Sequence, residues 1–485
     1  MNVETATGWV GGRQRGDGAV FKGIPYARAE RWGPPQPAAP WTGVRDALEF
    51  GPQAPQIPGL LEAAFGLADW PMSEDCLSLN IWTPAVEVSA GRPVLVFLHG
   101  GAFMNGTGAV PWYHGEAFAR DGCVLVTLNY RLGALGYLHL ADLAGERFAG
   151  SGNLGLLDQI AALDWVQANI TGFGGDPANV TVFGESAGGA SVLALLAAPA
   201  AAGRFHRAVA QSASIPQLRT RLQATAAAER VLQSLGIGVQ ELDRLLAVPV
   251  TDLLQVQASF TGPDLFTAFA PTPDGAVVPG SILERAAAAA VPLMIGTNRD
   301  ELYLFTALDG RSLSVDRDGL LRVARRYAGD GANDLVEAYA AARPGRRPGQ
   351  LGASIASDDA FWMPAIELAE RREAPTWMYR FDWPTPIFDG LLGACHGLEL
   401  PFVFDTLAAA QGFVGDDARL GDLAATVHRA WVRFATDGEP GWPAYDTVRR
   451  ATMRYDTTSG VVDDLDGPLR TRWVTRGAAT ASRPE

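Results

Sequence analysis

The segment 180–189 constrains the fold of this chain more than any other, because it places Gly-x-Ser-x-Gly between an apolar run and an Ala/Leu-rich run. A serine between a strand and a helix in this pattern occupies a tight, strained turn, the nucleophile elbow. Gly184 and Gly188 must be small so that strand and helix can approach each other. The pattern alone also fits a serine in an ordinary turn. The flanking runs favour the elbow, with Ser186 at the carboxyl edge of a sheet.

Short apolar and β-branched runs alternate with helical patterns, which predicts an α/β fold with a large, mostly parallel central sheet flanked by helices. The runs are 94–98, 124–129, 180–183, 292–295 and 376–383. A helix is expected where apolar residues recur every three or four positions from Leu156 to Ile170. Another is expected to begin at Asp422, with His428 on its surface. No stretch reads as a true linker, so residues 1–485 are expected to form one domain.

A second glycine cluster, His99-Gly-Gly-Ala-Phe103, directly follows the apolar run that ends at Leu98. Backbone N–H groups in such a loop can point into a site at the sheet edge. With the residue after Ser186 they would form an oxyanion hole, which stabilises the negative charge that acyl transfer places on a carbonyl oxygen. A flexible turn is the alternative interpretation. The predicted donors are the N–H groups of Gly101, Ala102 and Ala187.

A serine nucleophile needs a neutral imidazole to accept its proton and a carboxylate to hold that imidazole in one tautomer. Of the six histidines, His396 is the best candidate, because it lies in a glycine-flanked loop after the run 376–383. Asp300 and Glu301 follow the run 292–295, and either could be the acid. The order serine, acid, histidine is that of α/β hydrolases. Activity is expected to rise through about pH 6 to 7 as the imidazole becomes neutral.

Composition limits the partners and the compartment. The net charge of −14 argues against a nucleic-acid ligand, whose phosphates it would repel. Residues 1–12 lack the pattern of a secretion signal, and no later segment is apolar over the length that a membrane span needs. The three cysteines show no metal-ligand spacing and fit a reducing compartment. We therefore expect a cytoplasmic protein without a membrane partner.

Together these motifs resemble the type-B carboxylesterases, the family of bacterial para-nitrobenzyl esterases and animal cholinesterases, over nearly the whole chain. The segments that carry the resemblance, besides 183–189, are Ser73-Glu-Asp-Cys-Leu-Ser-Leu-Asn80, Gly152-Asn-Leu-Gly-Leu-Leu-Asp-Gln159, 21–26, 128–131, 211–214 and 442–445. It implies an α/β-hydrolase fold with helical insertions over the active site, and neither a metal nor an organic cofactor. Secreted relatives pair the residue matching Cys76 with a cysteine where this chain has Ala54, so that disulfide is expected to be absent.

The resemblance also implies residue roles. The family acid matches Glu301 rather than Asp300, and the family histidine matches His396. Ser214 and Glu399 match residues usually found behind this catalytic triad.

The oxyanion loop and the acyl pocket are assigned by resemblance too. Ala102 replaces a glycine of the family's oxyanion loop but keeps its N–H donor. Leu265 and Thr267 correspond to positions that line the acyl pocket in the family, and with Phe103 they form the expected substrate pocket. The side chains of Leu265 and Thr267 are smaller than the aromatic residues of cholinesterases, which leaves room for acyl groups longer than acetyl. A plain role in core or lid packing is the alternative.

The predicted activity is two-step hydrolysis of small carboxylic esters through an acyl-enzyme on Ser186. The same chemistry would serve an amide or carbamate hydrolase, and the sequence does not separate them. A noncatalytic, adhesion-like homologue is less favoured, because such relatives usually lose members of the triad. The expected partner is a small-molecule ester, and the protein is expected to be a monomer or homodimer.

Overall fold

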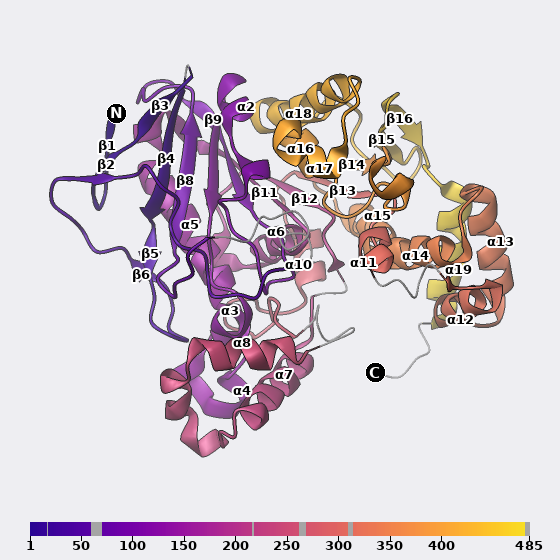
Figure 1. Ribbon diagram of the computed structural model, residues 1–485, viewed down its shortest axis with the longest axis horizontal. Helices are drawn as coiled ribbons and strands as arrows, with labels where there is room; N and C mark the ends of the chain where they lie inside the picture. The colour runs from indigo at the N-terminus through magenta and orange to yellow at the C-terminus, as the bar shows by residue number, and fades with distance from the viewer. Residues whose placement is uncertain (17, 60–69, 216–217, 261–267, 309–313, 481–485) are drawn as a thin grey trace.

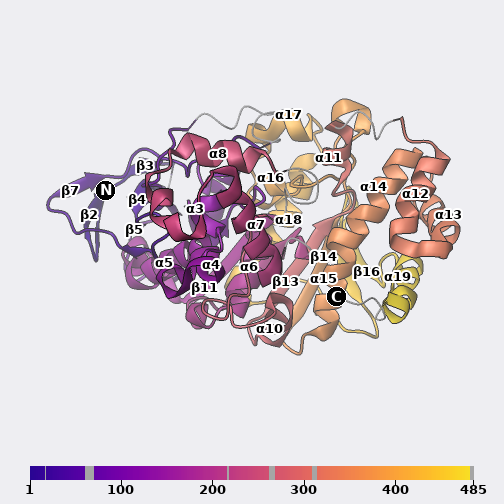
Figure 2. The ribbon, with the colours of Figure 1, turned by 90° about the horizontal axis from the view of Figure 1, so that it is seen from below.

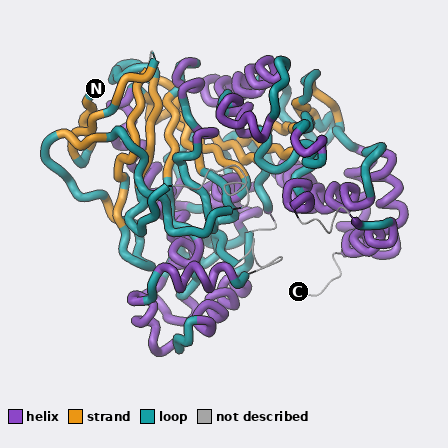
Figure 3. The backbone as a smooth tube through the Cα atoms, viewed as in Figure 1, coloured by secondary structure: helices purple, strands orange, loops and turns teal. Residues whose placement is uncertain are grey.

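A single large sheet organises the protein. The computed structural model describes residues 1–16, 18–59, 70–215, 218–260, 268–308 and 314–480. Eleven strands form this sheet, in the order β16-β15-β14-β13-β12-β11-β9-β10-β8-β4-β3. Figure 1 labels these strands except β10, and Figure 3 shows them as a band that crosses the molecule. The predicted α/β-hydrolase architecture is confirmed.

The middle of the sheet is parallel and its margins are antiparallel. The parallel strands are β9 Arg92–Leu98, β10 Val124–Leu128, β11 Gly175–Glu185, β12 Arg207–Gln211, β13 Leu293–Asn298, β14 Thr376–Phe381 and β15 Ala451–Tyr455. The antiparallel strands are β3 Arg13–Arg15, β4 Gly18–Pro25, β8 Ser78–Thr83 and β16 Gly460–Asp463. Each of the five predicted runs overlaps one of the parallel strands. Smaller sheets hold β1 Asn2–Thr5, β2 Gly8–Gly11 and β7 Val44–Asp46, and β5 Ala27–Arg28 with β6 Gln36–Pro37.

Helices fill the connections between the strands. Before β12 they are α2 Glu116–Arg120, α3 Gly133–Tyr137, α4 Ala141–Ala144, α5 Leu154–Asn169 and α6 Ala187–Ala197. Between β12 and β14 they are α7 Arg221–Ser234, α8 Val250–Ala258, α10 Ile282–Ala288, α11 Tyr303–Leu308, α12 Arg317–Ala328, α13 Ala332–Ala342, α14 Pro348–Ser357 and α15 Met363–Arg371. After β14 they are α16 Leu400–Val403, α17 Gln411–Val414, α18 Leu420–Asp437 and α19 Gly467–Thr480. Both views show α12, α13 and α19 together at one end of the molecule (Figures 1 and 2).

The two faces of the sheet build two separate apolar cores. Along β9, Val94 and Val96 join the core that also contains residues of α5, α6, α10 and α15, whereas Leu95 and Phe97 join the core shared with α16 and α18. Because helices cover both faces, the central strands are buried along their whole length. Functional groups can therefore gather only where the strands end.

The prediction that His428 lies on the surface is wrong. The helix begins at Leu420 rather than Asp422, and the imidazole of His428 is buried. Its Nδ1 is 2.7 Å from the carbonyl oxygen of Val403, and its ring centroid is 4.5 Å from that of Phe118. The apolar stripe of α18 identifies only the residues that face the sheet. His428 lies on another side of the helix, where neighbouring elements bury it.

The turn between β11 and α6 has the geometry that the glycine spacing requires. Ser186 connects the two elements with φ 58° and ψ −120°. A Cβ atom at Gly188 would lie 1.9 Å from the carbonyl oxygen of Leu98, and one at Gly184 would lie 2.5 Å from the carbonyl carbon of Gly188. Side chains at either glycine would force the helix away from the sheet.

We expect Gly188→Ala to lower the free energy of unfolding by about 3 kcal/mol or more, because the backbone of Leu98 leaves no room for a methyl group. The matched control is Gly421→Ala, at the second residue of α18 as Gly188 is at the second residue of α6, where nothing lies within 4 Å of the added atom. That control should be stabilised by about 0.5–1 kcal/mol through helix propensity. Urea unfolding followed by circular dichroism measures both. Equal effects would contradict the close approach at Gly188.

Candidate active site

Ser186 is fixed at the edge of the sheet by its own backbone. Its N–H donates to the carbonyl oxygen of Gln211, at the end of β12, at 2.9 Å. Its carbonyl oxygen accepts the N–H of Ala190 in the first turn of α6, also at 2.9 Å. The residue is 8% exposed. The strand end and the helix thus hold the serine at the elbow.

The structure brings His396 and Glu301 together. The Nδ1 atom of the imidazole is 2.6 Å from Oε2 of Glu301, and the backbone N–H of His396 donates to the carbonyl oxygen of Glu301 at 3.2 Å. The other carboxylate oxygen, Oε1, accepts from the hydroxyl of Ser212 at 2.6 Å and from the N–H of Asn298 at 2.7 Å. Since both residues are buried, these bonds fix the plane of the carboxylate and the tautomer of the imidazole.

Asp300, the other acid that the residues alone allowed, points elsewhere. Its Oδ2 accepts from the Nε and Nη2 atoms of Arg299 at 3.1 and 2.7 Å. The same oxygen accepts the N–H of Ala394 at 3.0 Å. Asp300 therefore anchors the loop that carries His396, and does not contact the imidazole.

The serine behind the pair is Ser212, whereas the resemblance pointed to Ser214. Ser214 is also buried, but the hydroxyl that contacts Glu301 is two residues nearer to β12. Ser212 has a positive φ of 43° at the bend directly after that strand, which turns its side chain toward Glu301. The sequence could have indicated Ser212, because it directly follows β12 just as Ser186 directly follows β11, and parallel strands end at the same edge of the sheet.

Glu399 lies in the same hydrogen-bond network. Its Oε1 accepts from Nε2 of Gln211 at 3.1 Å, and its Oε2 accepts from Nδ2 of Asn298 at 2.6 Å. Asn298 therefore bridges the carboxylates of Glu301 and Glu399, through its backbone N–H and its side chain. Burial and the charge of Glu301 raise the pKa of Glu399.

The second imidazole nitrogen of His396 faces Glu185, which sequence reasoning missed. Nε2 is 3.2 Å from Oε1 of Glu185, the residue before Ser186. Among the described residues this carboxylate, rather than the Ser186 hydroxyl, is the partner of Nε2. Catalytic hydrogen bonds often tighten only in the complex with substrate. Burial lowers the pKa of His396, but Glu185 and Glu301 outweigh it and raise the pKa to about 9.

The loop after β9 presents its backbone in an unusual conformation. Gly101, Ala102 and Phe103 have φ values of 108°, 52° and 60°. The carbonyl oxygen of Gly101 accepts the N–H groups of the two residues after Phe103, and the carbonyl oxygen of Phe103 accepts the N–H of Gly133 at 2.7 Å. In the part of the chain that the structure describes, no acceptor engages the N–H groups of Gly101, Ala102 or Ala187. Three backbone donors are thus available beside the elbow.

The predicted pocket residues divide into two groups. Phe103 is fully buried, and its ring packs at 5.0 Å against that of Tyr137. Leu265 and Thr267 lie outside the described residues.

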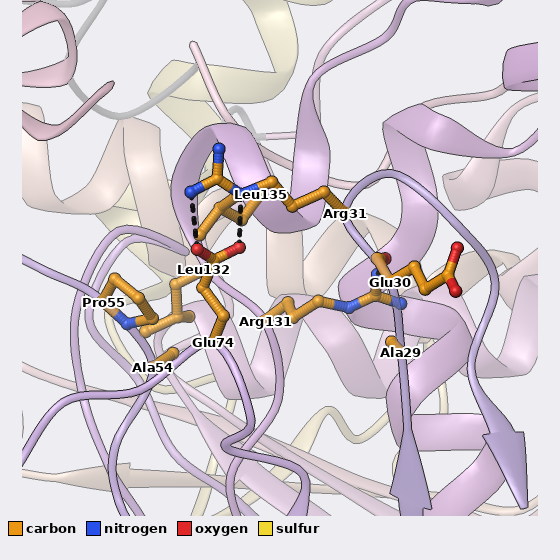
Figure 4. Close-up of a pocket in the computed structure, with 9 residues that line it drawn as sticks. All are labelled: Ala29, Glu30, Arg31, Ala54, Pro55, Glu74, Arg131, Leu132 and Leu135. Carbon is orange, nitrogen blue, oxygen red and sulfur yellow. Dashed lines mark hydrogen bonds and ion pairs between the residues drawn. The ribbon is translucent and has the colours of Figure 1, made fainter. Parts of the chain in front are cut away.

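A pocket elsewhere is lined by none of the predicted catalytic residues (Figure 4). On its wall Arg31 forms two hydrogen bonds of 2.6 Å with Glu74 (Figure 4). Arg131, also on its wall, is 2.7 Å from Asp158. Since these charges are already paired, we assign this pocket no role in the chemistry.

Three further features bear on cofactors, partners and redox state. Within the described ranges, no cluster of three or more His, Cys, Asp or Glu residues could hold a metal ion. No described helix is both long enough and apolar enough to cross a membrane. Cys76, Cys123 and Cys395 are free, buried thiols.

The fold, the strained Ser186 turn and the buried imidazole–carboxylate pair define an α/β hydrolase. The chain belongs to the carboxylesterase family, whose model matches residues 1–464. It is thus a carboxylic ester hydrolase by family.

Similar proteins cover nearly the whole chain. It is 39% identical to the para-nitrobenzyl esterase of Bacillus subtilis over 492 residues, covering 96% of this chain and 97% of the relative. It is 34% identical to a probable N-octanoylanthranilate hydrolase of Rhodococcus erythropolis over 493 residues, covering 95% and 99%. A crystal structure of the Geobacillus stearothermophilus carboxylesterase EST55 superposes with a TM-score of 0.87 and 40% identity, covering 97% of this chain and 99% of that one.

The raised pKa of His396 predicts an acid limb of kcat/KM well above the pH 6 to 7 expected from the sequence. Only the neutral imidazole accepts a proton, so kcat/KM should fall as the pH drops below about 9. Glu185→Gln removes a negative charge that favours the imidazolium ion. It should therefore lower the pKa and move the acid limb down by about one to three pH units.

The pH dependence of kcat/KM for a neutral ester measures this shift. Glu337→Gln, which removes an exposed carboxylate from α13, is the control and should leave the limb in place. An unchanged limb in Glu185→Gln would contradict the assignment of Glu185 as a source of the raised pKa.

Proposed function

We propose that this carboxylesterase hydrolyses small esters through an acyl-enzyme on Ser186, with His396 as general base and Glu301 as the acid that orients it. The observation that carries the proposal is the 2.6 Å contact between Nδ1 of His396 and Glu301. A buried carboxylate on Nδ1 leaves Nε2 as the nitrogen that exchanges a proton with the substrate side.

The proposed reaction has two steps. The Ser186 oxygen attacks the ester carbonyl carbon while Nε2 of His396 takes the hydroxyl proton. His396 then gives that proton to the departing alcohol, which leaves an acyl group on Ser186. A water molecule attacks this acyl group, His396 takes its proton, and the carboxylic acid leaves as Ser186 regains a proton.

Charge in both steps develops on the substrate carbonyl oxygen. The N–H groups of Gly101, Ala102 and Ala187 are proposed to stabilise it, each contributing about 3 kcal/mol. Every proton has a donor and an acceptor in this scheme, so the chemistry uses no metal and no organic cofactor.

The remaining assignments concern the chain as a whole. We propose that residues 1–485 act as one domain, because one sheet takes β3 from near the start of the chain and β16 from near its end. We further propose a cytoplasmic monomer or homodimer that acts on small-molecule esters, because the three free thiols fit a reducing compartment.

Amide hydrolysis is a second candidate, favoured by the similarity to the probable N-octanoylanthranilate hydrolase. It uses the same acyl-enzyme and differs in the protonation of the leaving group. A panel of aryl esters, alkyl esters, anilides and carbamates, compared by kcat/KM, distinguishes the candidates. The ester proposal requires esters to exceed anilides and carbamates that carry the same acyl group.

Ser186→Ala should abolish ester turnover, lowering kcat by about six orders of magnitude, without loss of folding. The matched control is Ser191→Ala on the same helix, which should stay active. The hydroxyl of Ser191 accepts a hydrogen bond from Gln159. An organophosphate followed by peptide mass spectrometry should label Ser186 alone. A label on another residue, or activity in Ser186→Ala, would overturn the assignment.

Acyl-chain length tests the proposed pocket. Butyryl and hexanoyl esters should exceed acetyl esters in kcat/KM, because each buried CH₂ contributes up to about 0.8 kcal/mol. Thr267→Phe should reverse this order by filling the space. Thr251→Phe, at an exposed position of α8, is the control and should leave the profile unchanged. A preference for acetyl esters in the unmodified enzyme would show that this segment does not select the acyl group.

A further inference from the structure

One helical segment next to His396 contains a rare widened turn. The chain stays helical through α14, then through a π-helical turn at Asp358–Trp362 labelled η10, and then through α15. Such turns often occur at functional sites. Pro364 gives a physical cause, because proline lacks the N–H of a regular helix and its ring would collide with the carbonyl group four residues earlier. The widened turn shifts the register of the side chains it carries.

The π-helical turn places Phe361 against the imidazole of His396. The two ring centroids are 5.3 Å apart, with 48° between the ring planes, and Phe361 is 3% exposed. The hydrogen bond to Glu301 fixes Nδ1 but still allows the ring to tilt about that bond. An aromatic wall at this distance restricts the tilt and excludes water from the ring.

The same helix also holds the backbone beside Glu301. The hydroxyl of Ser357, the last residue of α14, accepts the N–H of Leu302 at 2.9 Å and donates to the carbonyl oxygen of Ala353 at 2.7 Å. One turn earlier, the hydroxyl of Ser354 lies 3.0 Å from that of Tyr303. The two residues that follow Glu301 are therefore bonded to this helix.

Buried polar contacts tie the π-helical turn to the outer helices. The carboxylate of Asp358, its first residue, accepts a hydrogen bond from the hydroxyl of Tyr339 in α13. That hydroxyl accepts from Nε1 of Trp473 in α19 at 3.0 Å. On the side of the sheet, the guanidinium of Arg380 in β14 lies 5.3 Å from the ring of Trp362 in the turn. Contacts on both sides leave the turn little freedom to move relative to the sheet.

We propose that this segment, residues 348–371, is a brace for the catalytic pair, in which Phe361 is a positioning residue for His396 and Ser357 is a positioning residue for the loop of Glu301. The proposal deepens the proposed function and rests on it. Phe361 contacts the ring of His396, and Ser357 binds the backbone of the residue that follows Glu301. The brace therefore fixes the relative position of base and acid independently of the hydrogen bond between them.

The test compares Phe361→Leu with Phe205→Leu. Both phenylalanines are buried. Phe205 precedes β12 and therefore lies at the end of the strands opposite to Ser186. The backbone N–H of the next residue, His206, donates to the carbonyl oxygen of Val180 in β11. Phe361→Leu should lower kcat for para-nitrophenyl butyrate about tenfold or more, with KM within about twofold. It should also move the acid limb of kcat/KM to higher pH, because water that reaches the imidazole favours its charged form. Phe205→Leu should lower stability but change neither kcat nor the limb.

Ser357→Ala provides a second variant that removes little volume. It should lower kcat severalfold, because the N–H of Leu302 loses its acceptor, and it decides the question if Phe361→Leu fails to fold. The brace is overturned if Ser357→Ala keeps full kcat and Phe361→Leu behaves like Phe205→Leu. Organophosphate labelling of Ser186 in the same variants separates the two hypotheses. Label on Ser186 together with full kcat in both variants rejects the brace alone, whereas label elsewhere rejects the proposed function.

Discussion

The close approach of α6 to the sheet determines where the other groups of the site can lie. At Gly188 the helix comes so near to Leu98 that only a hydrogen atom fits between them. Leu98 is also the last residue of β9, and it pairs in register with Gly184 of β11. The loop with the backbone donors of Gly101 and Ala102 and the turn with Ser186 therefore leave the sheet at the same level. One contact between backbones thus sets the distance between the proposed nucleophile and the N–H groups proposed to stabilise the developing charge.

Three buried carboxylates surround one imidazole. Glu185, Glu301 and Glu399 are each 5% exposed or less, and unpaired charges so deeply buried would be costly. Donors from Ser212, Asn298 and Gln211 offset that cost for Glu301 and Glu399. The resulting negative potential favours an imidazolium ion, the form that His396 takes in the proposed mechanism once it accepts the serine proton. The same potential reduces the fraction of neutral imidazole near pH 7. The carboxylates thus stabilise the imidazolium form of His396 but reduce the amount of neutral imidazole that can accept a proton.

The sequence predicts what is local and misses what depends on distant partners. The Ser186 turn and the central strands follow from glycine spacing and apolar runs, which act within a few residues. The choice between Asp300 and Glu301 could not follow from the residues themselves, because neighbouring side chains diverge and only their partners, Arg299 and His396, distinguish them. The contact of Glu185 with His396 had no signal either, because it joins the end of β11 to a loop after β14. His428 was misplaced because periodicity reports one side of a helix only.

The order of strands in the sheet has a consequence for how the enzyme is made. His396 and Glu301 are 95 residues apart in the chain, and β15, which pairs with β14, follows both. A ribosome that has released β11 and α6 has therefore produced Ser186 but neither the proposed base nor the proposed acid. Pairings over such distances form late and slowly. On the proposed assignment, this unfinished chain carries the nucleophile without its activating groups, so hydrolysis can begin only after the segment with His396 has also been made.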